Sequence, residues 1–270
     1  MENQIIYLCE DTPDGIFTAV YDAWAAHIPD DRLSIQQERY HEMQLFADYV
    51  YVQTDLEKAV KVARSVRAKI GQEAYDMIYK ASLSYEKDKI DTIYRFLKLG
   101  FRYRSRVVEM HGNDTVCRLY ELGRNVGNEA HSFREFVRFH ESEEGILISR
   151  IRPKNQVLPI LAYHFSDRFP EEHFVILDEV HEMGLFHEKG RQWYLAPLDK
   201  TALDRIWAYR HISEYEELWK TFFRTIAIEE RRNYKCQRNM CALRYRDYMV
   251  EFNVSVSYTH LRAHETRRHL

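Results

Sequence analysis

The stretch EERRNYKCQRNMCALRYR, residues 229–246, combines the residue types that contact nucleic acid. After Glu230 it has no acidic side chain, and its basic residues are Arg231, Arg232, Lys235, Arg238, Arg244 and Arg246. Arginine and lysine contact phosphates, and arginine can also donate two hydrogen bonds to a base edge. Tyr234 and Tyr245 add rings that can stack on bases. The stretch therefore predicts a nucleic-acid-binding segment, with half of a metal site and the solvated end of a helical domain as alternatives.

Cys236 and Cys241 lie in the same stretch and could supply two thiolate ligands. A structural zinc ion or an iron–sulfur cluster needs further ligands, however. Cys9 and Cys117 are not in any paired spacing that would supply them. We therefore expect no metal site and no bound cofactor, and we interpret the cysteines as small, partly buried residues.

A second group of residues could perform acid–base chemistry. His164, Asp167 and Arg168 lie close together after an apolar run, and Asp178 ends the β-rich sequence FVILD. A carboxylate at a strand end with a nearby histidine can act as an acid–base pair, so these four are the candidate catalytic residues. The alternative, which we favour, is that His164 and Arg168 pair with carboxylates to hold this corner of the fold.

The familiar catalytic motifs are absent from the sequence. It contains no phosphate-binding G-x-x-x-x-G-K-[ST], no dinucleotide-binding G-x-G-x-x-G, no nucleophile elbow G-x-S-x-G and no zinc-binding H-E-x-x-H. Whether the chain is an enzyme therefore stays open at the level of sequence.

The composition is that of an ordinary globular protein. The 270 residues are 45% hydrophobic and 30% charged, with a net charge of −3, so any contact with nucleic acid must come from a local patch. Four scattered cysteines fit a reducing cytoplasm. The N-terminus has no signal-peptide pattern, and no apolar run is long enough to span a membrane. We therefore expect a cytoplasmic protein that does not contact membranes.

The end of the chain has a different character. VSYTHLRAHET, residues 256–266, resembles a translated sequencing adapter. We therefore expect residues 254–270 to be a non-native tail and exclude them from the prediction of the fold. Its three histidines, which could suggest a metal cluster, are excluded with it; they are His260, His264 and His269.

The first half of the chain reads as two short strands and several helices. The strands are expected at residues 5–10 and 49–54, and a capping box, Thr54-x-x-Glu57, begins a helix that ends near Gly71. Further helices are expected at residues 16–28, 72–84, 87–101 and 113–139. In the last of these, Gly123 and Gly127 would let a neighbouring backbone approach closely, and FREFVRF at its end is interpreted as core aromatics with Arg134 and Arg138 on the polar side.

After residue 144 the pattern changes to strands. GILISRI alternates, HFVILDEV is β-rich, and LFHEKGRQWYL indicates a hairpin that turns at Lys189 and Gly190. A second capping box, Ser213-x-x-Glu216, begins a final helical region. The fold class that follows is mixed α+β: helix-rich, with a small sheet at roughly residues 145–196 and additional N-terminal strands.

Three stretches together resemble a known family. They are DGIFTAVYDAW, the region from FVRF through ILISRIRPKNQVLPILAYHFSDRFP to FVILD, and IAIEERRNYKCQRNMCALRYRDYMVEF. They are similar to uncharacterised bacterial proteins described as DNA metabolism or DNA repair proteins. That family is genomically linked to a radical-SAM protein and is sometimes fused to a uracil-DNA glycosylase-like domain. The resemblance implies a single family domain over residues 4–253, although Ala242 stands where relatives tend to have proline.

The resemblance implies a role in DNA metabolism or repair. The chain lacks the three-cysteine cluster of a radical-SAM enzyme, so we expect a nucleic-acid-binding accessory protein that partners a radical-SAM or uracil-DNA glycosylase-like protein. One alternative is an enzyme that acts on a nucleotide or damaged base through His164, Asp167, Arg168 and Asp178. The other alternative is a protein-interaction module that makes no direct contact with DNA.

Overall fold

The protein is described here by a computed structural model that covers residues 3–29, 32–40, 44–211 and 214–252. The expected tail, residues 254–270, lies outside the described residues together with its histidines, and so does Ser213 of the second predicted capping box. Within the described ranges, no helix combines the length and the apolar character that crossing a membrane requires.

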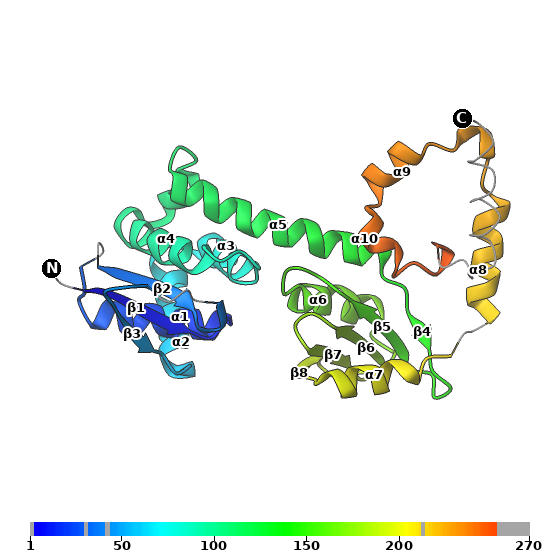
Figure 1. Cartoon of the computed structure of the whole chain (residues 1–270), viewed down its shortest axis with the longest axis horizontal. Coiled ribbons are helices and arrows are strands. Elements are labelled where there is room, and N and C mark those ends of the chain that lie inside the picture. Colours follow the sequence, from blue (N-terminus) through cyan, green and yellow to red (C-terminus); the bar gives the residue numbers. More distant parts are fainter. Residues whose placement is uncertain (1–2, 30–31, 41–43, 212–213, 253–270) are drawn as a thin grey trace. The chain divides into compact units, whose positions relative to one another are not determined.

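The chain divides into two compact units. The N-terminal unit comprises residues 1–129 and 154–157, and the C-terminal unit comprises residues 130–153 and 158–270. The boundary between the units falls within one long helix, α5 (Asp114–Phe136), which Figure 1 labels. The expectation of one family domain over residues 4–253 stays a prediction.

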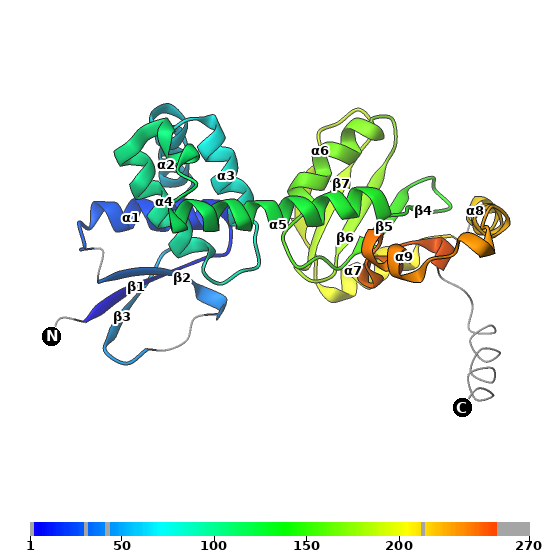
Figure 2. The same cartoon turned by 90° about the horizontal axis from the view of Figure 1, so that it is seen from above.

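The N-terminal unit is built on a three-stranded parallel sheet with the order β2-β1-β3, shown in Figure 2. Its elements are β1 (Gln4–Cys9), α1 (Pro13–Ala25), β2 (Leu33–Gln37), η1 (Glu38–Tyr40), β3 (Ala47–Tyr51), α2 (Leu56–Lys69), α3 (Gln72–Ser82), α4 (Lys89–Tyr103), η2 (Arg104–Glu109) and the first part of α5. The central strand β1 reads as an almost continuous apolar run because it is buried between its two neighbours and α1.

Side-chain caps fix where the first two helices begin. The Thr12 hydroxyl accepts a hydrogen bond from the Gly15 amide at 3.0 Å and starts α1. The predicted cap of the next helix was wrong by one residue, because Asp55 and not Thr54 accepts the bonds from the amides of Glu57 and Lys58. The Thr54 hydroxyl instead donates to the Glu10 carboxylate at 2.6 Å.

The C-terminal unit is built on a five-stranded mixed sheet with the order β4-β5-β6-β7-β8. Its strands are β4 (His140–Glu141), β5 (Leu147–Ile151), β6 (Phe174–Asp178), β7 (Met183–His187) and β8 (Tyr194–Pro197). The strands β5 and β6 are parallel, and β7 and β8 form the predicted antiparallel hairpin. The small sheet is therefore confirmed, and with it the mixed α+β fold class.

Helices cover both faces of this sheet. They are α6 (Leu158–Arg168) and α7 (Lys200–Ala208), and Figure 1 shows them beside the strands. Phe165 of α6 packs against Phe174 of β6, whereas Leu203 of α7 packs against Leu177 of the same strand. Because side chains alternate along a strand, Phe174 and Leu177 point to opposite faces. The helix α6 therefore covers one face and α7 the other.

The end of the described chain is helical, as the sequence predicts. It contains α8 (Glu214–Thr225), η3 (Glu229–Arg231), α9 (Tyr234–Met240), α10 (Leu243–Arg246) and η4 (Val250–Phe252). The buried ring of Tyr245 packs edge-on against Phe133 of α5 at 5.1 Å between ring centroids. Phe223 of α8 contacts Phe252 at 5.6 Å. The Tyr245–Phe133 contact therefore attaches the C-terminal segment to α5, whereas the Phe223–Phe252 contact joins α8 to η4 within that segment.

Candidate functional site

A pocket of about 760 Å³ lies in the C-terminal unit where the end of α5, the strand β5 and the helix α6 meet. We call it the arginine pocket. It is lined by His131, Arg134, Glu135, Val137, Arg138, Phe139, Leu147, His164, Phe165, Arg168 and Phe169. Helical spacing brings the polar ones together, because His131 and Arg134 are one turn apart on α5, as are His164 and Arg168 on α6.

The apolar wall of the arginine pocket consists of phenylalanine rings. Phe139 packs edge-on against Phe165 at 5.2 Å and against Phe169 at 5.6 Å between ring centroids. Phe165 is buried and anchors the cluster on Phe174 of the sheet. The wall is therefore held in place by the core of the unit.

Two arginines in this pocket have no carboxylate partner among the described residues. Arg134 makes no hydrogen bond or ion pair there, and its Nε atom is buried with no hydrogen-bond acceptor. The Arg168 guanidinium lies over the Phe169 ring at 5.6 Å. A buried polar atom without a partner is uncommon in a folded protein, so the Arg134 Nε atom is a donor for which the described chain offers no acceptor.

The third arginine, Arg138, is held by the chain itself. Its Nη1 atom donates to the carbonyl oxygens of Glu135 and Val137, and its Nη2 atom donates to the buried Glu251 carboxylate at 2.9 Å. Since η4 carries Glu251, the last described turn of the chain positions an arginine of the pocket.

The surroundings of His164 shift its pKa. Its pKa is lowered from the ordinary histidine value, first by burial and then by the positive charges of Arg134 and Arg168; Asp167 acts in the opposite direction. The imidazole is therefore neutral at pH 7, and an anion bound beside the arginines would make protonation easier. The second histidine, His131, lies 3.3 Å from a carboxylate oxygen of Glu135.

The chemistry of this arrangement suits a ligand that combines negative charge with an aromatic ring. Unpaired guanidinium groups can donate two hydrogen bonds to one phosphate, and phenylalanine rings can stack on a base. A neutral histidine can also accept or donate a proton at the same place. Binding of a phosphate-bearing ligand and acid–base chemistry on it are both open to this pocket.

The four candidate catalytic residues lie in two different places. His164 and Arg168 line the arginine pocket, whereas Asp167 follows on the exposed side of α6. Asp178 is buried at the end of β6, where its carboxylate accepts bonds from the amides of Val180 and His181 and contacts the His181 Nδ1 atom at 2.7 Å. Asp178 therefore holds the turn into β7 and does not line the pocket.

The basic segment 231–246 is mostly exposed. Every residue from 231 to 240 is solvent-exposed, and α9 buries no residue. Arg232 donates to the Tyr234 hydroxyl at 3.3 Å, while Arg244 and Arg246 lie over the rings of Tyr245 and Phe252. Arg231, Lys235 and Arg238 of this segment are therefore open to a partner in solution.

The cysteines of the same segment have different surroundings. Cys236 is exposed, and the Cys241 Sγ atom lies 3.6 Å from the Met249 sulfur. Across the ranges that the structure describes, no three histidine, cysteine, aspartate or glutamate side chains gather as a metal site would require.

Arg134 and Arg138 are the pocket residues that reasoning from the sequence did not select. Placing them on the polar side of FREFVRF is consistent with the structure. They form a candidate site only because α6 brings His164 and Arg168 to the same pocket. The available signal was the one-turn spacing of cationic residues in both segments, His131 with Arg134 and His164 with Arg168. What brings these two stripes together is the packing of α6 against the sheet, which spacing alone does not give.

Comparisons with known proteins place the chain in a family. A solved structure, described as a DHH domain from a member of a family of ribosomal proteins, is similar at a TM-score of 0.31 and 10% identity, over 69% of this chain and 74% of that one. Similarity this low assigns neither a fold nor a function. A search of the curated proteins found no match. Residues 87–251 match the model of a domain of unknown function, DUF4130. That range is more than half of the chain and contains the whole arginine pocket, and the protein belongs to the DUF4130 family.

Proposed function

We propose that the protein binds single-stranded nucleic acid through the arginine pocket and works in DNA metabolism or repair as an accessory partner of a radical-SAM or uracil-DNA glycosylase-like protein. One observation carries the binding: Arg134 and Arg168 face one pocket beside phenylalanine rings, and neither has a carboxylate partner among the described residues. The choice of DNA and of these partners comes from the family resemblance of the sequence.

A phosphate would supply what this pocket lacks. It would give the buried Arg134 Nε atom an acceptor, and it would offset the charges of Arg134 and Arg168, which add to burial in lowering the pKa of His164. The phenylalanine wall favours an unstacked base over a base inside a duplex, because neighbouring bases cover both ring faces of a base that is stacked in a duplex. The ligand that fits both requirements is a single strand, or a strand opened at a damaged base.

The basic segment is the second surface of the proposal. Its exposed cations, among them Arg231 and Arg238, can neutralise further phosphates of the same strand, and Tyr234 offers a half-exposed ring. Replacing Arg231, Arg238 and Arg244 by glutamate should then remove binding, whereas unchanged affinity would exclude this surface.

The test of the pocket is a binding titration of the full chain. The ligands are labelled single-stranded, double-stranded and uracil-containing DNA, each at two salt concentrations. We expect Arg134→Gln with Arg168→Gln to weaken single-strand binding more than tenfold, since a hydrogen bond to a charged group contributes about 1.5–3 kcal/mol. Lys200→Gln with Arg205→Gln removes the same charge from the exposed face of α7 and should leave binding unchanged. Equal losses in both double variants would refute the pocket as the binding site.

An enzymatic role is a second candidate, because His164 has a shifted pKa and lines a concave site. If His164 is catalytic, His164→Ala should abolish turnover of a damaged nucleotide while the melting temperature stays nearly unchanged. Unaltered product formation by that variant would leave only the binding role.

A protein-interaction role is a third candidate and has its own observation. Leu218, Phe222 and Ile226 follow one another at helical spacing along and just beyond α8, and all three are more than half exposed. Co-purification with the radical-SAM protein in the absence of DNA, lost in Phe222→Glu, would favour this role over direct DNA binding.

A further inference from the structure

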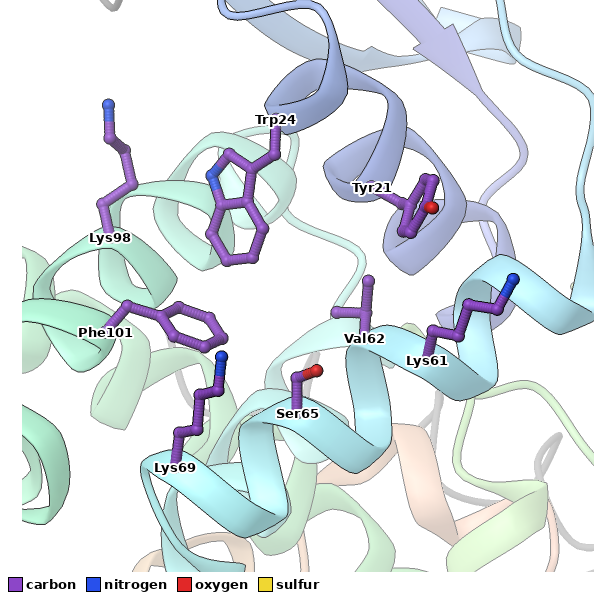
Figure 3. A pocket seen from close by; sticks show the side chains of 8 residues that line it. All are labelled: Tyr21, Trp24, Lys61, Val62, Ser65, Lys69, Lys98 and Phe101. Carbon is purple, nitrogen blue, oxygen red and sulfur yellow. The ribbon is translucent and has the colours of Figure 1, made fainter.

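A second pocket lies in the N-terminal unit, and it is lined by aromatic and basic side chains. Its volume is about 510 Å³, and it is formed by α1, α2 and α4. Figure 3 shows its lining: Tyr21 and Trp24 from α1, Lys61, Val62, Ser65 and Lys69 from α2, and Lys98 and Phe101 from α4. We call it the lysine pocket.

Two of the rings that line the lysine pocket pack against each other. Trp24 packs edge-on against Phe101, with 4.7 Å between ring centroids and an interplanar angle of 81°. Figure 3 shows Tyr21 on the other side of Trp24, with Val62 and Ser65 of α2 facing both of them. Tyr21, Trp24 and Phe101 are each only partly buried. The pocket therefore offers rigid ring surface to a flat ligand.

The charge of the lysine pocket has one sign. Its lining contains three lysines and no aspartate or glutamate. Lys61 has no carboxylate partner among the described residues, and the Lys69 ammonium lies 5.8 Å from the centroid of the Phe101 ring. The nearest acid of α1, Asp22, is already paired with Lys58 at 2.7 Å. An anionic group beside Lys61 and Lys69 would therefore meet positive charge.

We infer that the lysine pocket binds a nucleotide, with its base against Trp24 and Tyr21 and its phosphate on Lys61 and Lys69. A planar base matches the indole and phenol rings, and the Ser65 hydroxyl can exchange a hydrogen bond with its edge. Ammonium groups on flexible stems bind phosphate as point charges. The nucleotide is either free in solution or an unstacked residue of a strand, and both sources present the same groups.

The experiment is a titration of the full chain that follows its tryptophan fluorescence. Thymidine monophosphate, thymidine and inorganic phosphate are the free ligands, and a short oligothymidylate is the strand. We expect saturable quenching by the monophosphate at least tenfold tighter than by thymidine, and its loss in Lys61→Gln with Lys69→Gln. A higher affinity for the oligonucleotide would assign the site to a strand, and a higher affinity for the monophosphate would assign it to free nucleotide.

The controls separate this site from the rest of the surface. Arg64→Gln removes a charge from α2 outside the pocket and should change nothing. Trp24→Phe should still bind the monophosphate but should lose the quenching signal, and calorimetry would measure the remaining binding. This variant is used because Trp24→Ala could fail to fold. Equal affinity for thymidine and its monophosphate, or no saturable binding of either, would overturn the inference. If quenching persists in Arg134→Gln with Arg168→Gln, the lysine pocket binds its ligand independently of the arginine pocket, and this inference does not depend on the proposed function.

Discussion

At the scale of single residues, His164 is the most informative group in the arginine pocket. The groups around it are Arg134, Arg168 and Asp167, with His131, Glu135 and Arg138 lining the same pocket. Burial and the two arginines together lower its pKa, so the free protein holds it neutral. A bound phosphate offsets the arginine charges and favours the imidazolium, so binding of the anion and binding of a proton assist each other.

Binding at the arginine pocket should therefore depend on pH in a defined direction. The pKa of His164 is higher in the bound state than in the free state, so affinity for DNA should rise as the pH falls through about 6.5 and below. We expect His164→Gln to abolish most of this dependence, measured as the dissociation constant between pH 8 and pH 5.5. His131→Gln is the control, and a dependence that follows His131 instead would contradict the assignment.

The same residues show what a sequence can and cannot predict about a site. The sequence places His164 and Arg168 close together after an apolar run, but the helix α6 that sets them one turn apart was not predicted. It also suggests Asp178, since a carboxylate at a strand end is a common site residue, but this one is satisfied by amides two and three residues further along the chain. Arg134 joins His164 only through tertiary packing, for which spacing gives no signal.

At the scale of elements, the predictions from periodicity were the most reliable. The long helix expected at residues 113–139 is α5 (Asp114–Phe136), and the backbone approach expected at Gly123 is present, because a Cβ atom there would lie 3.7 Å from the Met77 carbonyl oxygen. Gly127 has no such neighbour. The misplaced cap at Thr54 shows the limit, since Thr54 and Asp55 are both good caps, and in the structure the Thr54 hydroxyl bonds to Glu10 while Asp55 caps the helix.

The start of α4 depends on a buried ion pair that no periodicity reveals. Lys89 is fully buried, pairs with the Asp11 carboxylate in the loop after β1, and donates to the Ser84 carbonyl oxygen at 2.5 Å. Burial lowers the pKa of this lysine, and Asp11 opposes that shift. The pair therefore joins the β1–α1 loop to the beginning of α4.

Removing the acid of this pair should cost more than removing the base. Asp11→Ala leaves a buried ammonium without its counter-charge, and we expect a loss of about 3 kcal/mol, the low end for a buried pair because the Asp11 side chain is 30% exposed. Lys89→Met leaves only a carboxylate that can turn to solvent, so its loss should be smaller. Urea denaturation measures both, and a larger loss for Lys89→Met would contradict this account of the pair.

At the scale of the whole molecule, the distribution of charge matters more than its sum. The chain carries a net charge of −3, yet the linings of both pockets hold more cations than acids. The segment from Arg231 to Arg246 adds six further cations without an acid. Overall attraction to a polyanion is therefore weak, and binding must come from these local surfaces.

The salt dependence of DNA affinity should show how many phosphates each of these surfaces neutralises. Each neutralised phosphate of a single strand contributes about 0.7 to the slope of log affinity against log salt. Arg134→Gln with Arg168→Gln should therefore reduce the slope by about 0.7, because the two arginines share one phosphate. Lys61→Gln with Lys69→Gln should do the same if a strand occupies the lysine pocket. The measurement is affinity at four or more salt concentrations, with Lys200→Gln and Arg205→Gln as the unchanged reference. An affinity that falls while the slope stays constant would mean that Arg134 and Arg168 shape the pocket without touching phosphate.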